Sequence, residues 1–225
     1  MAYIIRGAYN KNQYSDFIQL TPESKAENDE DLRFFQEEIV KTPISRLPYV
    51  MGLRYPKPSS VYRMTCPVPE NKFHNFMYSD CGILVSQTIV DLIEEFEPGV
   101  HQFFLVELLM TDDQTPPQPY YILNVCTYVQ SLDLDKSDVY VRRLPEERHK
   151  LFAYKFSAVP EKASQNLKEP YRYFVSKEKI EGRAIWGEYG FDLGSTPFIS
   201  EAFHDRVQEI GGFGACDIWQ RTGEL

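Results

Sequence analysis

The sequence predicts an α+β fold: a mostly antiparallel sheet with two or three packed helices and two similar strand-helix-strand units. Short apolar runs of strand length, bounded by proline, glycine and polar residues, recur along most of the chain. Only a few stretches carry apolar residues at helical spacing. In addition, "CGILVSQTIVDLIEEFEPGVHQFF" (residues 81–104) and "TPFISEAFHDRVQEIGGFGACDIW" (residues 196–219) follow one common pattern.

Each copy of this pattern contains an apolar strand, a serine suited to cap a helix, an amphipathic helix, a glycine stop and a second strand. The serine is Ser86 in the first copy and Ser200 in the second, and each hydroxyl is expected to accept an amide hydrogen bond of the first turn. A constant offset also relates two acidic positions, and the glycines match after one inserted residue. The matching pairs are Asp91 and Asp205, Glu95 and Glu209, and Gly99 and Gly214.

The repeat has two interpretations. Duplication or structural mimicry is favoured by the matching residues and by the apolar stripes. Chance similarity is the alternative, because strand, serine, helix and glycine commonly follow one another. In either case we expect a folding role, in which two capped helices each cover part of one sheet. Glu94, Glu95 and Glu97 are expected on the solvated side of the first helix.

The first part of the chain predicts less regular structure. Residues 2–9 and 16–20 predict short strands, and residues 27–40 predict an amphipathic helix with an acidic face. Residues 41–73 contain six prolines and are expected to be extended and irregular. We therefore divide the chain into an N-terminal extension, residues 1–75, that packs on a main α+β domain, residues 76–225.

Between the two copies, residues 120–129 predict one strand, and residues 170–190 predict two strands around a turn. Residues 111–120 predict an exposed polar loop. Three acids in "DLDKSD" (residues 133–138) are spaced like the start of a calcium loop, but the glycine and the terminal glutamate of that loop are absent. This segment therefore predicts a turn.

Composition limits the classes of protein to consider. The chain of 225 residues has a formal net charge of −9 and shows no basic patch, so nucleic-acid binding is not expected. It has no apolar run of membrane-spanning length and no secretory signal, which predicts a cytoplasmic protein without a membrane partner. The four cysteines are far apart and form no CxxC pair, so they are expected to be reduced thiols. The acidity explains solubility, and it would also suit a basic protein partner.

A search for catalytic motifs finds no GxSxG elbow, GxxxxGK[ST] loop or HExxH pair. "GGFGAC" (residues 211–216) follows a helix and precedes a strand, so it predicts a helix stop and not a phosphate loop. The four histidines are scattered. We therefore expect no enzyme, no catalytic or metal-ligating residue and no cofactor. An enzyme whose site is assembled from distant segments stays open as an alternative.

Several motifs resemble those of a known family. "DCGILVSQTIVDLIEEFEPGVHQFF", "YYILNV", "LDLDKS" and the C-terminal "FISEAFHDRVQEIGGFGACDIW" occur in this order. In this order they resemble the bacterial polymorphic-toxin immunity protein family that is typified by a Myxococcus immunity protein and was formerly described as a domain of unknown function. The resemblance covers about Phe76 to Trp219. Leu105 stands where family members often have proline, and the charged span from Arg142 to Lys168 matches no pattern of the family.

The resemblance implies a protein that binds and neutralises a cognate secreted antibacterial toxin, encoded nearby and delivered by a type VI or contact-dependent system, with a nuclease as one candidate. It implies no catalytic residues. An acidic inhibitor would complement a basic toxin surface and associate with it rapidly. An enzyme with a dispersed active site and a general protein-interaction module are the two alternatives.

Candidate toxin-binding residues are chosen for expected exposure and charge. Asp112 and Asp113 begin the predicted loop of residues 111–120, and Tyr120 ends it. The acidic face of the predicted N-terminal helix supplies the others: Glu27, Asp29, Glu30, Asp31, Glu37 and Glu38.

Overall fold

The computed structural model confirms the α+β class within the residues that it describes, in which two larger sheets, two small sheets and three helices are found. The described residues are 2–7, 19–20, 54, 61–66, 73–79, 82–110, 116–137, 139–143, 154–158, 173–188, 197–214, 216–219 and 223–224. The predicted helix over 27–40 and most of the proline-rich segment lie outside them.

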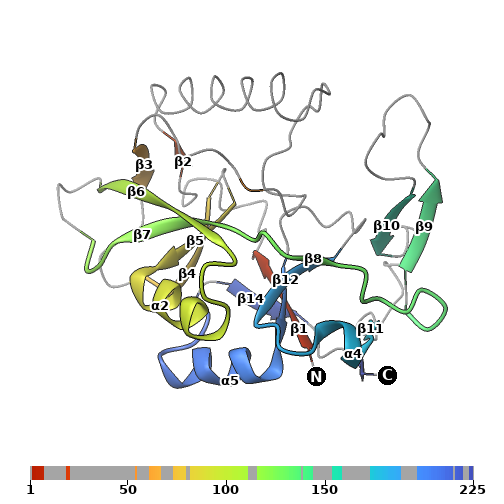
Figure 1. The fold of residues 1–225 in the computed structure, drawn as a ribbon. Helices are drawn as coiled ribbons and strands as arrows, with labels where there is room; N and C mark the ends of the chain where they lie inside the picture. Colours follow the sequence, from red (N-terminus) through yellow and green to blue (C-terminus); the bar gives the residue numbers. More distant parts are fainter. Residues whose placement is uncertain are drawn as a thin grey trace.

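The larger sheet has six strands (Figure 1). In their order across the sheet they are β2 (Gln19–Leu20), β3 (Tyr62–Cys66), β6 (Gln102–Met110), β7 (Tyr120–Asn124), β5 (Gly82–Ser86) and β4 (Phe76–Ser79). All neighbours are antiparallel except β3 and β6, which are parallel. Burial alternates along β3 and β6, as expected for strands with one face in the core.

The second sheet has five strands. In their order they are β14 (Cys216–Trp219), β1 (Ala2–Gly7), β13 (Phe198–Ser200), β12 (Ile185–Glu188) and β8 (Tyr128–Val129). The small sheets pair β9 (Val139–Arg143) with β10 (Tyr154–Ala158), and β11 (Phe174–Val175) with β15 (Gly223–Glu224).

The predicted repeat is present in the fold. The first unit contains β4, β5, helix α2 (Gln87–Phe96), β6 and β7, and the second contains β12, β13, helix α5 (Glu201–Glu209), β14 and β1. In each unit a hairpin leads into the helix, and the strand after the helix lies parallel to the strand before it, with one antiparallel strand between them. The strand between is β7 in the first unit and β1 in the second.

The two units also share their register. The Ser86 N–H donates to the Asn75 carbonyl oxygen at 3.0 Å, and the Ser200 N–H donates to the Ala184 carbonyl oxygen at 2.9 Å. In both units the accepting residue directly precedes the first strand. Chance similarity of a common sequence pattern does not explain a shared register, so the structure favours duplication or mimicry.

The helix ends explain the matching serines and glycines. Ser200 caps α5 as predicted, because its hydroxyl oxygen accepts from the Phe203 N–H at 3.3 Å. Ser86 occupies the same position before α2, but the predicted bond is wrong: its hydroxyl donates to Asn75 Oδ1 at 2.9 Å. Gly99 and Gly214 have φ values of 67° and 63°, a region that favours glycine, so the match has a conformational cause.

The predicted stop after the second helix is confirmed. Gly211 and Gly212 follow α5 with positive φ. The Gly212 N–H donates to the Val207 carbonyl and the Gly211 N–H to the Gln208 carbonyl, which is a Schellman ending.

Both helices pack into one core cluster. Ile89 and Ile93 of α2 lie in it with Phe203 and Val207 of α5. The rings of Phe96 and Phe203 meet edge to face at 5.7 Å, where α2 and α5 lie side by side in Figure 1. The expectation that both helices cover one sheet is wrong, because their strands belong to two sheets that share this core.

Two other expectations require correction. Residues 120–129 form two strands, β7 and β8, that belong to different sheets. Within residues 170–190 the predicted turn contains a short helix, α4 (Lys177–Ile180). Strands from both sides of residue 75 share the two larger sheets, since β1 lies inside the five-stranded sheet and β3 pairs with β6 in the other. No helix among the described residues is long and apolar enough to cross a membrane.

Candidate functional site

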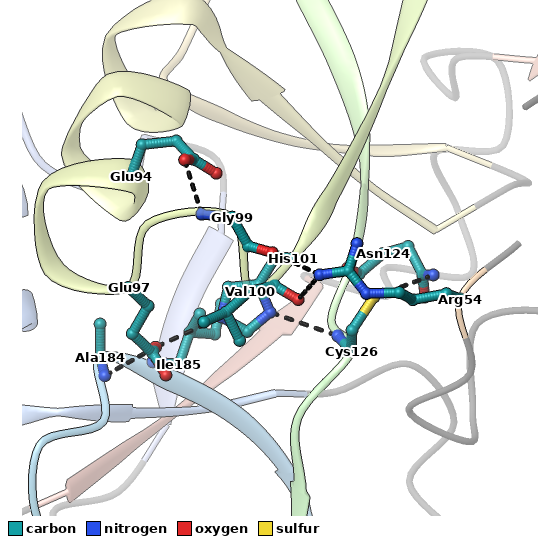
Figure 2. Close-up of polar contacts among 10 residues, drawn as sticks. All are labelled: Arg54, Glu94, Glu97, Gly99, Val100, His101, Asn124, Cys126, Ala184 and Ile185. Atoms are coloured by element: carbon teal, nitrogen blue, oxygen red, sulfur yellow. Dashed lines mark hydrogen bonds and ion pairs between the residues drawn. The ribbon is translucent and has the colours of Figure 1, made fainter.

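The most extensive polar site lies where α2 ends against the second unit (Figure 2). Glu97 directly follows α2, and it is only 6% exposed. Its Oε2 accepts hydrogen bonds from the Ala184 N–H at 2.8 Å and from the Ile185 N–H at 3.0 Å. Ile185 begins β12 and Ala184 directly precedes it, so one carboxylate from the first unit fixes the start of the first hairpin strand of the second.

His101 extends this site. Its Nε2 lies 3.3 Å from Glu97 Oε2, and its Nδ1 lies 3.2 Å from the Cys126 amide nitrogen. Because the amide N–H can only donate, Nδ1 is the acceptor and the neutral ring carries its proton on Nε2. The ring therefore donates to Glu97, and main-chain geometry fixes the tautomer.

The electrostatics of Glu97 follow from these contacts. Burial alone would raise the pKa of this carboxyl group, since it disfavours the charged form. The hydrogen bonds from His101, Ile185 and Ala184 act in the opposite direction and together outweigh burial, so the pKa of Glu97 lies below its usual value. The site therefore holds a carboxylate anion at neutral pH.

A reciprocal contact joins the end of α5 to the start of β4. Asn75, before β4, donates from Nδ2 to the Ile210 carbonyl oxygen at 3.0 Å, directly after α5. In both cases, the residue that follows the helix of one unit is hydrogen-bonded to the start of the first hairpin strand of the other unit. The rings of Phe76 and Phe213 stack beside this contact at 5.0 Å.

The turn after α2 is held from both sides. The Gly99 N–H donates to Glu94 Oε2 at 2.8 Å. The exposed Arg54 donates from Nη2 to the Gly99 carbonyl and, at 3.0 Å, to the Val100 carbonyl (Figure 2). Of the segment "EPGVHQF", Glu97, Gly99 and His101 are thus all used in internal contacts.

Among the described residues, Cys126 is the candidate nucleophile near this site. Its Sγ lies 3.4 Å from the Asn124 carbonyl oxygen and 3.7 Å from Gln102 Oε1. His101 meets the main-chain amide of Cys126 and not this sulfur. Burial raises the pKa of the Cys126 thiol, and the charge of Arg54 only partly opposes the shift. The cluster is therefore arranged to hold the two units together and not to activate a thiolate.

A second buried carboxylate lies at the other end of β12. Glu188 is 4% exposed and accepts from the Ser131 N–H at 2.7 Å, the Ser131 hydroxyl at 2.6 Å and the Leu132 N–H at 2.9 Å. Burial outweighs these bonds and raises the pKa of Glu188 to about 7. Like Glu97, this side chain connects segments that are distant in the sequence.

The structure corrects the expected exposure of one predicted toxin-binding residue. Tyr120 was expected to be exposed at the end of a loop, but it starts β7 and is 1% exposed. Its hydroxyl donates to the His74 carbonyl oxygen at 3.2 Å, and burial raises its pKa to about 12. The remaining predicted residues lie outside the described ones: Glu27, Asp29, Glu30, Asp31, Glu37, Glu38, Asp112 and Asp113.

Sequence reasoning missed the buried polar residues. Glu97 was expected on the solvated side of the helix with Glu94 and Glu95, which is wrong because the helix ends at Phe96 and the chain turns inward. The signal was its spacing: Glu97 follows Ile89 by eight residues and Ile93 by four, which continues the apolar face of the helix. Asn75 gave no comparable signal.

Metal-binding chemistry finds no support in the described segments, where no group of three or more His, Cys, Asp or Glu residues could hold an ion. The described part of "DLDKSD", residues 133–137, forms the predicted turn. Asp133 Oδ1 accepts from the Asp135 N–H at 3.0 Å and from the Lys136 N–H at 3.1 Å, so its carboxylate is used by the turn. Cys66 and Cys126 are free thiols, as expected.

Fold and site together define a class: an α+β protein of two joined units whose buried polar groups serve its own architecture. A family model described as "Immunity protein family (Imm11)" matches residues 9–219. The chain belongs to this immunity protein family, and the match includes most of the segment that was set apart as an N-terminal extension. A comparison with curated proteins found no match.

Proposed function

We propose that this protein binds a cognate antibacterial toxin and neutralises it by protein-protein interaction. The family match over residues 9–219 carries the proposal, since immunity proteins have toxins as partners. The geometry supports it, because the most conspicuous polar residues near α2 hold the fold together and leave no thiolate or base poised for chemistry. The action is therefore assigned to the surface and not to a catalytic centre.

We extend the proposal to the origin, delivery and chemistry of the toxin. The toxin is encoded beside this chain, it is delivered by a type VI or contact-dependent system, and it is met in the cytoplasm. We favour a nuclease, because nucleases bind phosphates through basic surfaces and a chain with net charge −9 complements such a surface. Neither a nucleic acid nor a membrane is a partner in this proposal.

The test is co-expression with the protein encoded immediately upstream. The chain is tagged, the two proteins are purified together, and cell survival is recorded with and without the chain. A stable one-to-one complex and survival only in its presence would support the proposal. A neighbour that is toxic but neither bound nor neutralised, or one without toxicity or binding, would refute it.

A further inference from the structure

One face of β3 and β6 is open to solvent. Along β6, Leu105, Glu107 and Leu109 are exposed, whereas Val106 and Leu108 between them are buried. Such alternation is ordinary for a sheet with one covered face. The chemistry is less ordinary, because two of the three outward positions on β6 are leucines.

The neighbouring strand extends this surface in register. Arg63 on β3 lies beside Glu107, and Thr65 lies beside Leu109. Continuing the register by one residue brings the exposed Val61 beside Leu105. We name these six residues the β3–β6 platform: Val61, Arg63, Thr65, Leu105, Glu107 and Leu109.

The platform gathers the exposed apolar side chains of the described residues. Three large hydrophobic side chains are exposed in these segments, namely Val61 at 49%, Leu105 at 46% and Leu109 at 39%. All three belong to the platform. Between them, Arg63 Nε and Glu107 Oε2 form an ion pair at 2.7 Å. Its charges already compensate each other, which lowers the cost of covering this surface.

The platform is the uncovered half of a face that α2 covers elsewhere. Val85, Tyr121 and Leu105 lie opposite one another on β5, β7 and β6, so their side chains share this face. Val85 is buried in the core cluster of α2, Tyr121 is half-buried, and Leu105 is exposed. Because α2 stops short of β6 and β3, a partner could continue the layer that the helix begins.

An acidic residue of α2, Asp91, is linked by hydrogen bonds to Tyr121, the neighbour of Leu105 in the sheet. The Tyr121 hydroxyl donates to Gln87 Oε1 at 2.6 Å, and Gln87 Nε2 donates to Asp91 Oδ1 at 2.7 Å on the exposed side of α2. A partner that covers the leucines and extends to α2 would thus meet negative charge, in a chain whose net charge is −9.

We infer that the β3–β6 platform is the surface that contacts the toxin, and that the toxin presents an apolar centre surrounded by lysine or arginine. This inference rests on the proposed function and gives it a location. Apolar side chains at the centre and charged groups at the rim are the usual arrangement of a specific protein interface.

The experiment compares two double variants that add the same positive charge. L105K/L109K places two lysines on the platform, and A202K/Q208K places two lysines at exposed positions of α5. Affinity for the protein encoded immediately upstream is measured by calorimetry, and thermal unfolding confirms that both variants fold. We expect L105K/L109K to weaken binding by roughly 100-fold or more and A202K/Q208K by less than about tenfold, since interface centres dominate affinity. L105A/L109A, which removes apolar area without adding charge, should also weaken binding.

The outcomes separate the location from the function. If the wild-type chain binds its neighbour and L105K/L109K binds equally well, the platform is not the contact surface, although the proposed function stands. If the wild-type chain does not bind, the proposed function itself fails. Analytical ultracentrifugation tests whether a second copy of the chain binds the platform instead. If the wild-type chain is a dimer, and L105K/L109K is a monomer with full toxin affinity, the platform is a self-association surface and the inference is overturned.

Discussion

Glu97 and Glu188 are both buried carboxylates, yet their pKa values move in opposite directions. Glu97 receives two amide hydrogen bonds and a third from His101, and these outweigh burial. Glu188 also receives three bonds, but burial dominates and raises its pKa to about 7. At the residue scale, the two side chains should therefore give the stability of the protein opposite dependences on pH.

Glu97 variants test the joint between the units. All three donors converge on one oxygen, so the amide oxygen of E97Q can still accept them, whereas E97A leaves buried N–H groups without an acceptor. We expect E97Q to lower the free energy of unfolding by about 1–2 kcal/mol and E97A by roughly 3 kcal/mol or more, because charge-assisted bonds exceed neutral ones and unsatisfied donors cost most. Urea denaturation measures both, and an equal loss in the two variants would contradict this account.

Glu97 should also make the stability of the protein depend on pH in the acidic range. Since the folded pKa of Glu97 lies below the unfolded value of 4.5, its stabilisation is present above pH 4.5 and is lost as the pH falls toward the folded pKa. E97Q should flatten the acid limb of the stability profile, as measured by urea denaturation from pH 3 to pH 7.

Glu188 should give the stability of the protein the opposite dependence on pH. With a folded pKa of about 7 and an unfolded value of 4.5, the folded state favours the neutral acid, so stability declines as the pH rises from 4.5 through 7. E188Q keeps a neutral side chain, and its NH₂ group can donate to the Ser131 hydroxyl. We expect E188Q to be more stable than the wild type at pH 8, by at most ~3 kcal/mol, and to lose this advantage at pH 4.5. A variant less stable at pH 8 would show that the ionised bonds outweigh burial.

Two serines occupy equivalent positions at the element scale but act differently. Ser200 accepts the Phe203 N–H, so S200A should cost about 1 kcal/mol through the lost helix cap. Ser86 donates to Asn75, which also binds Ile210, so S86A should act through Asn75. A double-mutant cycle of S86A with N75A should give a coupling of roughly 1 kcal/mol, whereas S200A with N75A should be nearly additive. Equal coupling in both cycles would contradict the difference.

The sequence predicts helices and their ends well because these depend on neighbouring residues. The serine and glycine positions are local signals that lie at the helix ends in the structure. The apolar stripes are local as well, and they mark the buried faces of the helices. The bond that each serine forms is not local: Ser86 differs from Ser200 because Asn75 stands where the second unit has Ala184. Tyr120 was misjudged for the same reason, since its burial depends on β5 and β6 at both sides of β7.

At the scale of the whole molecule, the fold class and the repeat could be predicted, but the assignment of strands to sheets could not. Strand alternation says which residues face inward and not which strand is the neighbour. β1 gave no signal that it lies between β13 and β14, and residues 120–129 gave none that the chain changes sheets at Cys126. The toxin-binding residues were chosen by charge, whereas the platform is defined by apolar residues that only strand register brings together.

The positions of β1 and β3 predict that residues 76–225 do not fold cooperatively without residues 1–75. A fragment of residues 76–225 lacks β1, the strand between β13 and β14, and β3, the neighbour of β6. We expect it to show no cooperative thermal transition, since the five-stranded sheet would lose a central strand. The full chain, measured beside it by circular dichroism, is the control. A cooperative transition in the fragment would support an independent domain.

The position of β1 also has a consequence for synthesis. Ala2 leaves the ribosome long before Ser200, but it pairs with Ser200, and Ile4 pairs with Trp219. The strands of the first unit lie close together along the chain and can pair while translation continues, because domains generally fold as their segments emerge. The five-stranded sheet can be completed only after β13 and β14 have been synthesised. A ribosome that stops before Phe198 therefore releases a product in which β1 has neither neighbour.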